Sequence, residues 1–258
     1  MSSTNRYSDY DNWASMYDEA MGTDNYDMKI ALLENLLLQR LPESAHIFDL
    51  CCGTGQVAKR LIEKGYRVTG LDGSEMMLSY ARKNVADAKF ILDDARFFKL
   101  PPTFDAVIST DRGLSHILSI EELKSVFKNV CTSLLTNGWF VFDLYLEEDG
   151  ESLISGGSIS YISDNHVMAT RWSYDSDKKL GEADVARFEL INGNWQRLDW
   201  NYSYRAYSPK LIQQTLEQLG FTEVNIYYIN RDLGVDIGQE SDWACVVCRK
   251  QTSTLRKS

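Results

Sequence analysis

Apolar positions follow two different periods up to Tyr145. Between Asn25 and Arg40 they recur every three or four residues, which predicts a helix that Pro42 closes. Beyond this helix, short apolar runs alternate with further helical periods. Strands are expected at residues 45–51, 66–72, 88–93, 104–110 and 138–145, and helices at residues 56–64, 74–83 and 120–135. Strands that alternate with helices pair in parallel, so this part predicts an α/β fold with a Rossmann-like, doubly wound sheet.

The pattern changes between Ser158 and Tyr207, where no helical period is found. Apolar and aromatic residues alternate with polar ones, and the sequence NGN at residues 192–194 supplies the turn of a hairpin. Two sets of side chains are expected to lie on one face: His166, Met168, Thr170, Trp172 and Tyr174, and Leu198, Trp200, Tyr202 and Tyr204. We therefore predict an antiparallel β insertion after the fifth strand. Its aromatic face either covers the edge of the main sheet or forms a lid over a substrate pocket.

After Pro209 the α/β pattern returns, with a helix to Leu219 that Gly220 caps and strands at residues 222–229 and 243–249. These two strands could pair as an antiparallel hairpin, and they complete a sheet of seven. The last strand contains Cys245 and Cys248 in a C-x-x-C spacing. Side chains three positions apart on a strand point to opposite faces, so buried core cysteines are favoured over a redox or metal motif. No metal site is expected.

Composition narrows the class of protein. The 258 residues are 44% hydrophobic, which suits one large domain or one domain with an insertion. The formal net charge of −10 would repel a long polyanion, so no nucleic-acid partner is expected. No apolar stretch approaches the roughly 20 residues that span a bilayer, and the N-terminus lacks the apolar region of a signal peptide. With five cysteines, two of them adjacent, a disulfide framework is not indicated. We expect a cytoplasmic protein without a membrane partner.

A glycine turn follows the first strand, in the stretch FDLCCGTGQVAKRL at residues 48–61. Residues 53–58 fit the G-x-G-x-x-A fingerprint of dinucleotide sites, and Asp72 ends the next strand where a ribose-binding carboxylate belongs. An NAD-dependent oxidoreductase is therefore one interpretation. Asp49 argues against it, because a carboxylate at the end of the first strand would repel a pyrophosphate and attract an ammonium group. S-Adenosylmethionine carries such an ammonium group and no phosphate.

Several motifs in order resemble those of the class I S-adenosylmethionine-dependent methyltransferases, from about Tyr10 to Arg249. They read YDNWASMYD, FDLCCGTG, GLDGSEMMLSYAR and LDDARFF. The resemblance implies S-adenosylmethionine as cofactor, with Tyr17 over its methionine end and with Asp49, Gly53 and Gly55 at the turn, where Cys51 replaces the family's first glycine. It further implies that Asp72 binds the ribose hydroxyls and that Gly73 and Met77 lie beside the adenine. Asp94 would accept a hydrogen bond from the adenine amino group, and Ala95 would donate its backbone N–H group. Each of these carboxylates also fits a plain helix cap or turn residue.

Methyl transfer is an in-line displacement at a sulfonium carbon, so the protein must mainly align the acceptor. A base is needed only for a protonated acceptor, and it should follow the fourth strand. In this segment Thr110 would line the cofactor through its backbone, whereas Asp111, Arg112 and His116 would project toward the acceptor. We expect His116 to act as a general base or to orient the acceptor, because imidazole titrates near neutral pH. A structural role at a helix start is the alternative.

Other charged and aromatic residues complete the expected acceptor site. Asp111 would act with His116 by orienting an amine, unless it pairs with Arg112. Arg112 would favour an anionic acceptor if it is unpaired. His166, Trp172 and Trp200 of the insertion are candidate substrate contacts, although a lone histidine in a strand is often structural. His46 begins the first strand, away from the chemistry, and we exclude it.

The resemblance is closest to members that methylate small metabolites. We therefore expect a methyltransferase that acts on an oxygen or nitrogen of a small molecule. The expected organisation is an N-terminal helical lid at residues 1–45, a cofactor-binding core at residues 46–146 and 208–250, and an insertion at residues 147–207 that covers the substrate or forms a homodimer surface. A non-catalytic cofactor-binding or oligomerisation domain is a further alternative.

Overall fold

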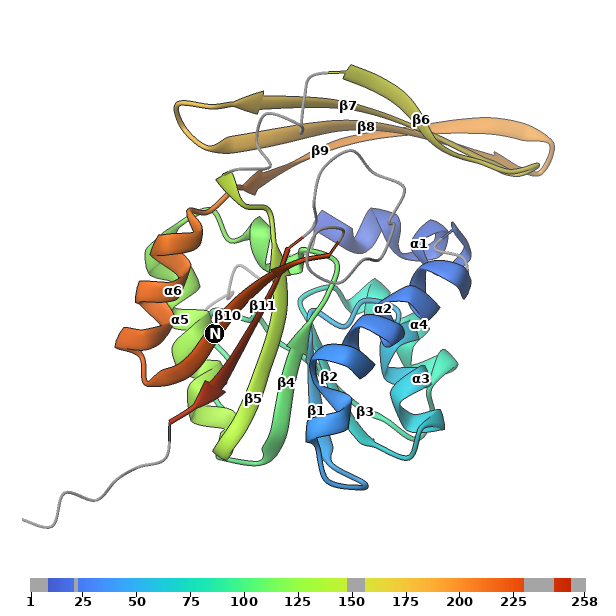
Figure 1. The fold of residues 1–258 in the computed structure, drawn as a ribbon. Helices are drawn as coiled ribbons and strands as arrows, with labels where there is room; N and C mark the ends of the chain where they lie inside the picture. Colours follow the sequence, from blue (N-terminus) through green and yellow to red (C-terminus); the bar gives the residue numbers. More distant parts are fainter. Residues whose placement is uncertain (1–8, 21–22, 148–155, 230–243, 252–258) are drawn as a thin grey trace, which may run out of the picture.

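The structure, a computed structural model, describes residues 9–20, 23–147, 156–229 and 244–251. Its centre is a seven-stranded sheet in the order β10-β11-β5-β4-β1-β2-β3 (Figure 1). The strands are β1 (His46–Leu50), β2 (Arg67–Asp72), β3 (Lys89–Leu92), β4 (Phe104–Ser109), β5 (Leu134–Leu144), β10 (Phe221–Tyr228) and β11 (Ala244–Lys250). The first five run parallel, and β11 runs antiparallel to both β5 and β10. The predicted sheet and its terminal hairpin are confirmed.

Helices cover both faces of this sheet (Figure 1). They are α2 (Thr23–Leu36), α3 (Gln56–Glu63), α4 (Glu75–Asn84), α5 (Ile120–Ser133) and α6 (Pro209–Gln218). Apolar side chains of α5 and α6 pack on one face, and those of α2 and α3 pack on the other. Leu123, Val126, Phe127 and Val130 form the buried stripe of α5. Burying each such side chain contributes about 1.5–3 kcal/mol, so this stripe anchors α5 to the sheet.

Helix ends follow local signals, with small differences from the sequence prediction. Ser74 caps α4 as expected, and its hydroxyl oxygen accepts a hydrogen bond from the Met77 N–H group at 3.0 Å. The first predicted helix ends early, because Leu37 leaves the helical region (φ −136°) and residues 38–40 form a 3-10 turn, η2 (Leu38–Arg40). Leu219 caps α6, and Gly220 follows it with a positive φ of 89°.

The two cysteines of the C-x-x-C spacing confirm the core interpretation. Cys245 is 8% exposed and packs with the side chains on the α2 and α3 face. Cys248 is fully buried in the cluster on the opposite face. Strand alternation therefore separates the two thiols across the sheet, as expected for a β-strand.

A second sheet, of four antiparallel strands, lies as a separate layer above the seven-stranded sheet in the view of Figure 1. Its strands are β6 (Gly156–Ile162), β7 (His166–Asp175), β8 (Leu180–Ile191) and β9 (Asn194–Arg205). Asn192 (φ 51°) and Gly193 (φ 79°) form the two-residue turn between β8 and β9. Opposed pairs in the ladder, such as Val185 with Trp200 and Ala183 with Tyr202, confirm the predicted aromatic face.

The N-terminal segment lies between this layer and the core. It forms η1 (Asp9–Trp13) and α1 (Ala14–Ala20), which contact α4. Ala14 and Met16 are buried in one cluster with Met77 of α4 and Met168 of β7. Residues 9–20 of the predicted lid therefore pack under the aromatic face of the insertion, whereas α2 packs on the main sheet. Residues 1–8 and 21–22 of that lid lie outside the described residues.

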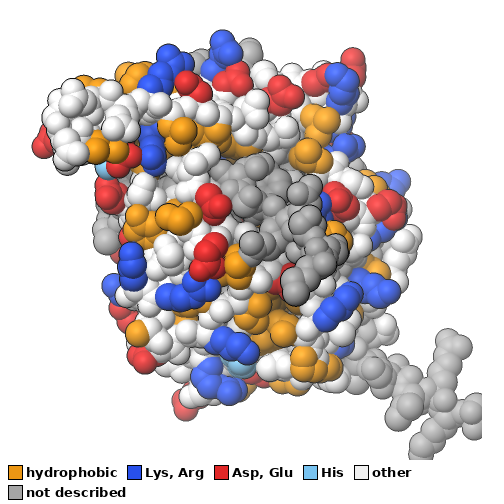
Figure 2. Space-filling view, turned by 180° about the vertical axis from the view of Figure 1, so that it is seen from behind, with side chains coloured by type: hydrophobic (Ala, Val, Ile, Leu, Met, Phe, Trp, Pro, Cys, Tyr) orange, Lys and Arg blue, Asp and Glu red, His pale blue; other side chains and the backbone are white. Residues whose placement is uncertain are grey.

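The described helices include none that is long and apolar enough to cross a membrane. The surface opposite to the view of Figure 1 carries acidic and basic side chains interspersed among neutral and hydrophobic ones (Figure 2).

Candidate functional site

The glycine turn after β1 has a left-handed backbone at three positions. Cys51 (φ 61°), Gly53 (φ 54°) and Gly55 (φ 78°) all have positive φ values, which glycine adopts freely and cysteine only at a cost. A Cβ atom added at Gly55 would lie 3.1 Å from the Cβ atom of Ala81 in α4, and one added at Gly53 would lie 3.7 Å from Cε1 of Tyr17. The turn is therefore bare backbone held between α4 and the N-terminal segment.

Asp49 stands beside this turn as a buried carboxylate. It is 1% exposed, and its Oδ2 atom has no hydrogen-bond partner among the described residues. Burial and the nearby carboxylate of Asp72 raise the pKa of Asp49 to about 7, and Lys29 offsets only part of this effect. Because a buried carboxylate oxygen without a partner is costly, the position suits a ligand that brings a cation. The α-ammonium group of S-adenosylmethionine fits it, and a pyrophosphate does not.

Asp72 fixes the backbone on the other side of the turn. Its carboxylate accepts hydrogen bonds from the N–H groups of Gly53 and Ser74, both at 2.9 Å. Burial raises the pKa of Asp72, while these N–H groups act in the opposite direction. Gly73 separates Asp72 from the helix cap, and Met77 is buried one turn into α4. Asp72, Gly73 and Met77 thus follow one another from the end of β2 into α4, beside the glycine turn. Their contacts with the ribose and the adenine stay predictions.

Asp94 follows β3, and a neighbouring arginine binds it. The Nε and Nη2 atoms of Arg96 lie 3.0 Å and 2.8 Å from the two carboxylate oxygens of Asp94. Arg96 also contacts Glu122 at 2.8 Å, so both members of this ion pair are held in place. Ala95 is 7% exposed, and its carbonyl oxygen accepts a hydrogen bond from Asn129 at 3.3 Å. An adenine amino group would have to share Asp94 with Arg96.

The segment after β4 makes a second left-handed turn, at Asp111 (φ 70°) and Arg112 (φ 58°). Asp143, near the end of β5, accepts hydrogen bonds from both of their N–H groups, at 3.1 Å and 2.7 Å. Burial raises the pKa of Asp143 to about 6, and Arg112 acts in the opposite direction. Sequence reasoning missed Asp143, although an acid within the apolar run GWFVFDLY is a usable signal. Thr110 directly precedes this turn and lines a small cavity with Lys29.

The side chain of Asp111 points to the N-terminal helices. Its Oδ2 atom lies 2.9 Å from the Nζ atom of Lys29 and accepts a hydrogen bond from the Tyr17 hydroxyl group. Burial would raise the pKa of Asp111, but Lys29 and Arg112 hold it below its ordinary value. Burial and Asp111 raise the pKa of Tyr17 well above 10, so this phenol stays protonated. Lys29, which is 3% exposed, was also missed; a lysine on the apolar face of the first predicted helix was the available signal.

Arg112 takes a different direction from Asp111. Its guanidinium group lies 4.9 Å from the ring centre of Tyr145, in cation–π contact. The structure therefore shows Lys29, rather than Arg112, as the cation in contact with the Asp111 carboxylate.

His116 ends the short helix η3 (Gly113–His116) and connects three elements. Its Nδ1 atom lies 3.1 Å from the carbonyl oxygen of Ser203 in β9, and its Nε2 atom lies 2.6 Å from the hydroxyl group of Tyr10. A carbonyl can only accept, so we assign the proton to Nδ1 and let Nε2 accept from Tyr10. Burial lowers the pKa of His116 to about 4. The ring is neutral at pH 7 and joins the N-terminal segment to the insertion.

Aromatic rings surround His116 on the side of the insertion. The ring centres of Tyr10 and Tyr202 lie 5.2 Å and 5.3 Å from that of His116, and Trp172 lies 6.0 Å from Tyr202. Trp200 packs against the same cluster. The structure thus brings two predicted acceptor contacts, His116 and Trp172, to one aromatic region.

His166 lies apart from this group, near one end of the insertion. It is 6% exposed, with Nδ1 at 3.4 Å from Glu19 of α1 and Nε2 at 3.3 Å from Glu189 of β8. This places it between the N-terminal segment and the insertion. His46 contacts Thr69 at the opposite end of the main sheet, which agrees with its exclusion.

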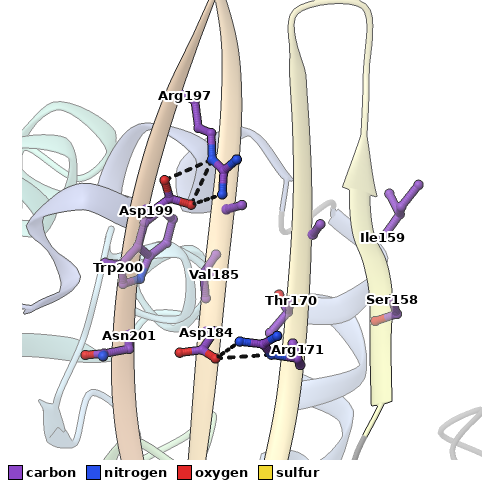
Figure 3. A pocket seen from close by; sticks show the side chains of 12 residues that line it. Ser158, Ile159, Thr170, Arg171, Asp184, Val185, Arg197, Asp199, Trp200 and Asn201 are labelled. Atoms are coloured by element: carbon purple, nitrogen blue, oxygen red, sulfur yellow. Dashed lines mark hydrogen bonds and ion pairs between the residues drawn. The ribbon is translucent and has the colours of Figure 1, made fainter.

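A groove of about 910 Å³ crosses the other face of the insertion (Figure 3). Two ion pairs lie in it, Arg171 with Asp184 and Arg197 with Asp199. All four side chains are exposed and alternate along the strands with the inward-facing aromatic residues. This groove is therefore separated by the sheet from Asp49, Asp111 and His116.

Comparisons with known proteins agree with this geometry. Residues 47–138 match the family model described as a methyltransferase domain. YqeM of Bacillus subtilis (strain 168), which is named as a methyltransferase, is 29% identical over 217 residues, covering 82% of this chain and 86% of the relative. A dTDP-4-amino-2,3,4,6-tetradeoxy-D-glucose N,N-dimethyltransferase of Saccharopolyspora spinosa is 25% identical over 196 residues, covering 69% of this chain and 78% of the relative.

Solved structures share the fold across nearly the whole chain. The amino pentose methyltransferase CalS10 of Micromonospora echinaspora, solved with S-adenosylmethionine bound, superposes with a TM-score of 0.73 at 17% identity. The match covers 93% of this chain and 97% of that one. The matched region therefore includes most of the insertion as well as the seven-stranded sheet.

Proposed function

The chain belongs to the class I S-adenosylmethionine-dependent methyltransferases, and we propose that it methylates an amine nitrogen of a small molecule. S-Adenosylmethionine is its cofactor, and it supplies an electrophilic methyl group on a positively charged sulfur when bound. We propose that Asp49 holds the ammonium group of the cofactor, that the bare backbone at Gly53 and Gly55 admits it closely, and that Tyr17 covers the turn.

The state of His116 is the observation that favours nitrogen over oxygen as acceptor. A hydroxyl acceptor needs a base to take its proton, and such a base works best with a pKa near the working pH. His116 has a pKa of about 4, and its Nε2 atom accepts a hydrogen bond from Tyr10. Asp111, the other predicted catalytic residue, is in contact with Lys29 and Tyr17. A neutral amine reacts through its own lone pair and needs no base before transfer.

The aromatic region supports the same choice. N-Methylation leaves a positively charged nitrogen until a proton is released, and the faces of Tyr and Trp rings attract such a cation. Tyr10 and Tyr202 lie next to His116, and Trp172 lies next to Tyr202, so such rings are at hand in this region. The relative from Saccharopolyspora spinosa, named as an N,N-dimethyltransferase of an amino sugar nucleotide, is consistent with this proposal.

A transfer assay tests the proposal. The purified chain is incubated with methyl-labelled S-adenosylmethionine and pairs of small acceptors that differ only in carrying an amine or a hydroxyl group at one carbon, amino sugars included. We expect label on the amine of at least one pair and at least tenfold less on its hydroxyl partner. Faster labelling of hydroxyls, with loss of that activity in His116→Ala, would show that nitrogen is the wrong acceptor. Binding of NAD in place of S-adenosylhomocysteine would contradict the assignment of Asp49.

Three further expectations belong to this proposal. The net charge of −10 supports the absence of a nucleic-acid partner. We also propose that the protein acts in the cytoplasm and that it forms a homodimer. Sedimentation of the purified chain tests the dimer directly.

A further inference from the structure

The turn after β4 holds two consecutive residues in the left-handed region of the backbone. Asp111 (φ 70°) and Arg112 (φ 58°) are consecutive, and neither is glycine. Residues held in this region carry strain, which persists only where the surrounding structure determines the backbone and which concentrates at functional sites. The turn also contacts the cofactor side: a Cβ atom added at Gly113 would lie 3.0 Å from the Cβ atom of Cys51. A group that fixes this turn therefore also fixes the position of the predicted acceptor residues relative to the predicted cofactor residues.

Asp143 is that group. Its Oδ2 atom accepts a hydrogen bond from the Asp111 N–H group at 3.1 Å, and its Oδ1 atom accepts one from the Arg112 N–H group at 2.7 Å. Consecutive N–H groups in a left-handed turn converge on an anion, and here a side chain of the same protein supplies it. Asp143 is 3% exposed and sits on β5 between β4 and β11, opposite Cys245. It is thus anchored in the rigid centre of the sheet.

We propose that Asp143 is a positioning residue for the methyl acceptor, which it serves by holding the Asp111–Arg112 turn through both N–H groups. This inference rests on the proposed function. The turn directs the Asp111 carboxylate to Lys29 and Tyr17 and places the Arg112 guanidinium over Tyr145. We call the two hydrogen bonds from the Asp111 and Arg112 N–H groups to Asp143 the clamp. Without the clamp the backbone of the two residues would relax toward negative φ, and both side chains would change direction.

Asp143→Asn is the first test. Asparagine keeps one acceptor but turns an NH₂ group toward the second backbone N–H, so the clamp is lost with almost no change in volume. We expect kcat/KM for the amine acceptor to fall on the order of 100-fold, since small misplacements have effects of this size. The Kd for S-adenosylhomocysteine, measured by calorimetry, should change much less than kcat/KM, because the hydrogen bonds from the Asp111 and Arg112 N–H groups to Asp143 act on the cofactor side only indirectly, through Asp111 and Tyr17.

Asp105→Asn is the matched control. Asp105 also accepts a backbone hydrogen bond, from the N–H group of His46 at 2.8 Å, but it lies at the opposite end of the sheet. Its replacement should leave acceptor kinetics and cofactor affinity unchanged. If Asp143→Asn leaves acceptor kcat/KM unchanged, or weakens cofactor binding as much as turnover, the positioning role is refuted.

A second comparison separates the effect of backbone strain at position 112 from the effect of losing the Arg112 side chain. Asp143→Asn is combined with Arg112→Ala and, separately, with Arg112→Gly; neither background has the guanidinium group, but only glycine adopts φ 58° without strain. We expect Asp143→Asn to cost acceptor turnover at least about fivefold less in the glycine background. Equal losses in the two backgrounds would refute the clamp.

The double variants also test the proposal if Asp143→Asn by itself does not fold. Folding with glycine but not with alanine at position 112 supports the clamp, and failure of both variants to fold overturns it, because Asp143 would then serve the fold as a whole. The proposed function fails separately: if the unmodified protein binds S-adenosylhomocysteine but methylates no amine, the acceptor assignment is wrong. A wild-type amine transfer that Asp143→Asn does not reduce refutes only the inference about Asp143.

Discussion

Replacing Asp49 by asparagine should stabilise the ligand-free protein while it removes cofactor binding. Burial and Asp72 raise the pKa of Asp49 from 3.8 to about 7 in the folded state. A group with a raised pKa binds its proton more tightly when folded, so its stabilising contribution is complete below pH 4 and is lost as the pH rises through about 7. At about 1.36 kcal/mol per pKa unit, ionised Asp49 costs about 4 kcal/mol at pH 8, and asparagine does not.

Thermal unfolding at several pH values measures this cost. The advantage of Asp49→Asn over the unmodified protein should grow by about 2–3 kcal/mol between pH 5 and pH 8, which corresponds to about 5–10 °C in Tm for a chain of this size. Asp175→Asn is the control, because Lys178 lowers the pKa of Asp175 from 3.8. That carboxylate is ionised in both the folded and the unfolded chain above about pH 5, so its variant should show no trend between pH 5 and pH 8. Equal Tm differences at pH 5 and pH 8 would refute the reasoning about Asp49.

S-Adenosylhomocysteine completes the comparison. Its ammonium group supplies a partner for the Oδ2 atom of Asp49, which has none among the described residues, so saturating ligand should raise the Tm of the unmodified protein at pH 8. The same ligand should leave the Tm of Asp49→Asn unchanged. A ligand-induced rise of similar size in both proteins would place the ammonium group elsewhere.

Three further outcomes are expected. The affinity for S-adenosylhomocysteine should increase as the pH rises from 5.5 to 7.5, because binding requires ionised Asp49; calorimetry showing a flat profile would contradict this. Gly55→Ala should destabilise the protein by about 1–3 kcal/mol more than Gly65→Ala in chemical denaturation, because both have positive φ but only Gly55 has Ala81 within 3.1 Å of an added Cβ atom. Lys29→Met should lower the free energy of unfolding by about 3 kcal/mol, because it leaves the partly buried Asp111 without the cation in contact with it, and adding Asp111→Asn should recover part of this loss. Additive losses in the double variant would refute the pairing.

Local signals in the sequence were sufficient for much of the cofactor side. Gly53 and Gly55 mark the turn because their positive φ values are a property of the chain itself. Asp49 and Asp72 end successive strands of the α/β pattern, and parallel strands bring such ends to one edge of the sheet. The aromatic face of the insertion also followed from alternation alone, as the register of β8 and β9 confirms.

The acceptor side depended on contacts that no local pattern contains. Asp143 bonds to residues 31 and 32 positions away, and His116 bonds to Ser203 across 87 positions. The sequence marked His116 as titratable near neutral pH, but its burial between Tyr10 and β9 keeps the ring neutral.

The sequence by itself therefore determined the order of strands and helices, the glycine turn and the acidic strand ends, because periodicity and backbone preference act over a few residues. Only the tertiary structure decided which charges meet. It placed Lys29 rather than Arg112 on Asp111 and directed the N–H groups of Asp111 and Arg112 to Asp143. It also left the Oδ2 atom of Asp49 without a hydrogen-bond partner among the described residues. Electrostatic energies in a buried site depend on desolvation and on distances of a few ångströms between remote segments, and packing alone sets both.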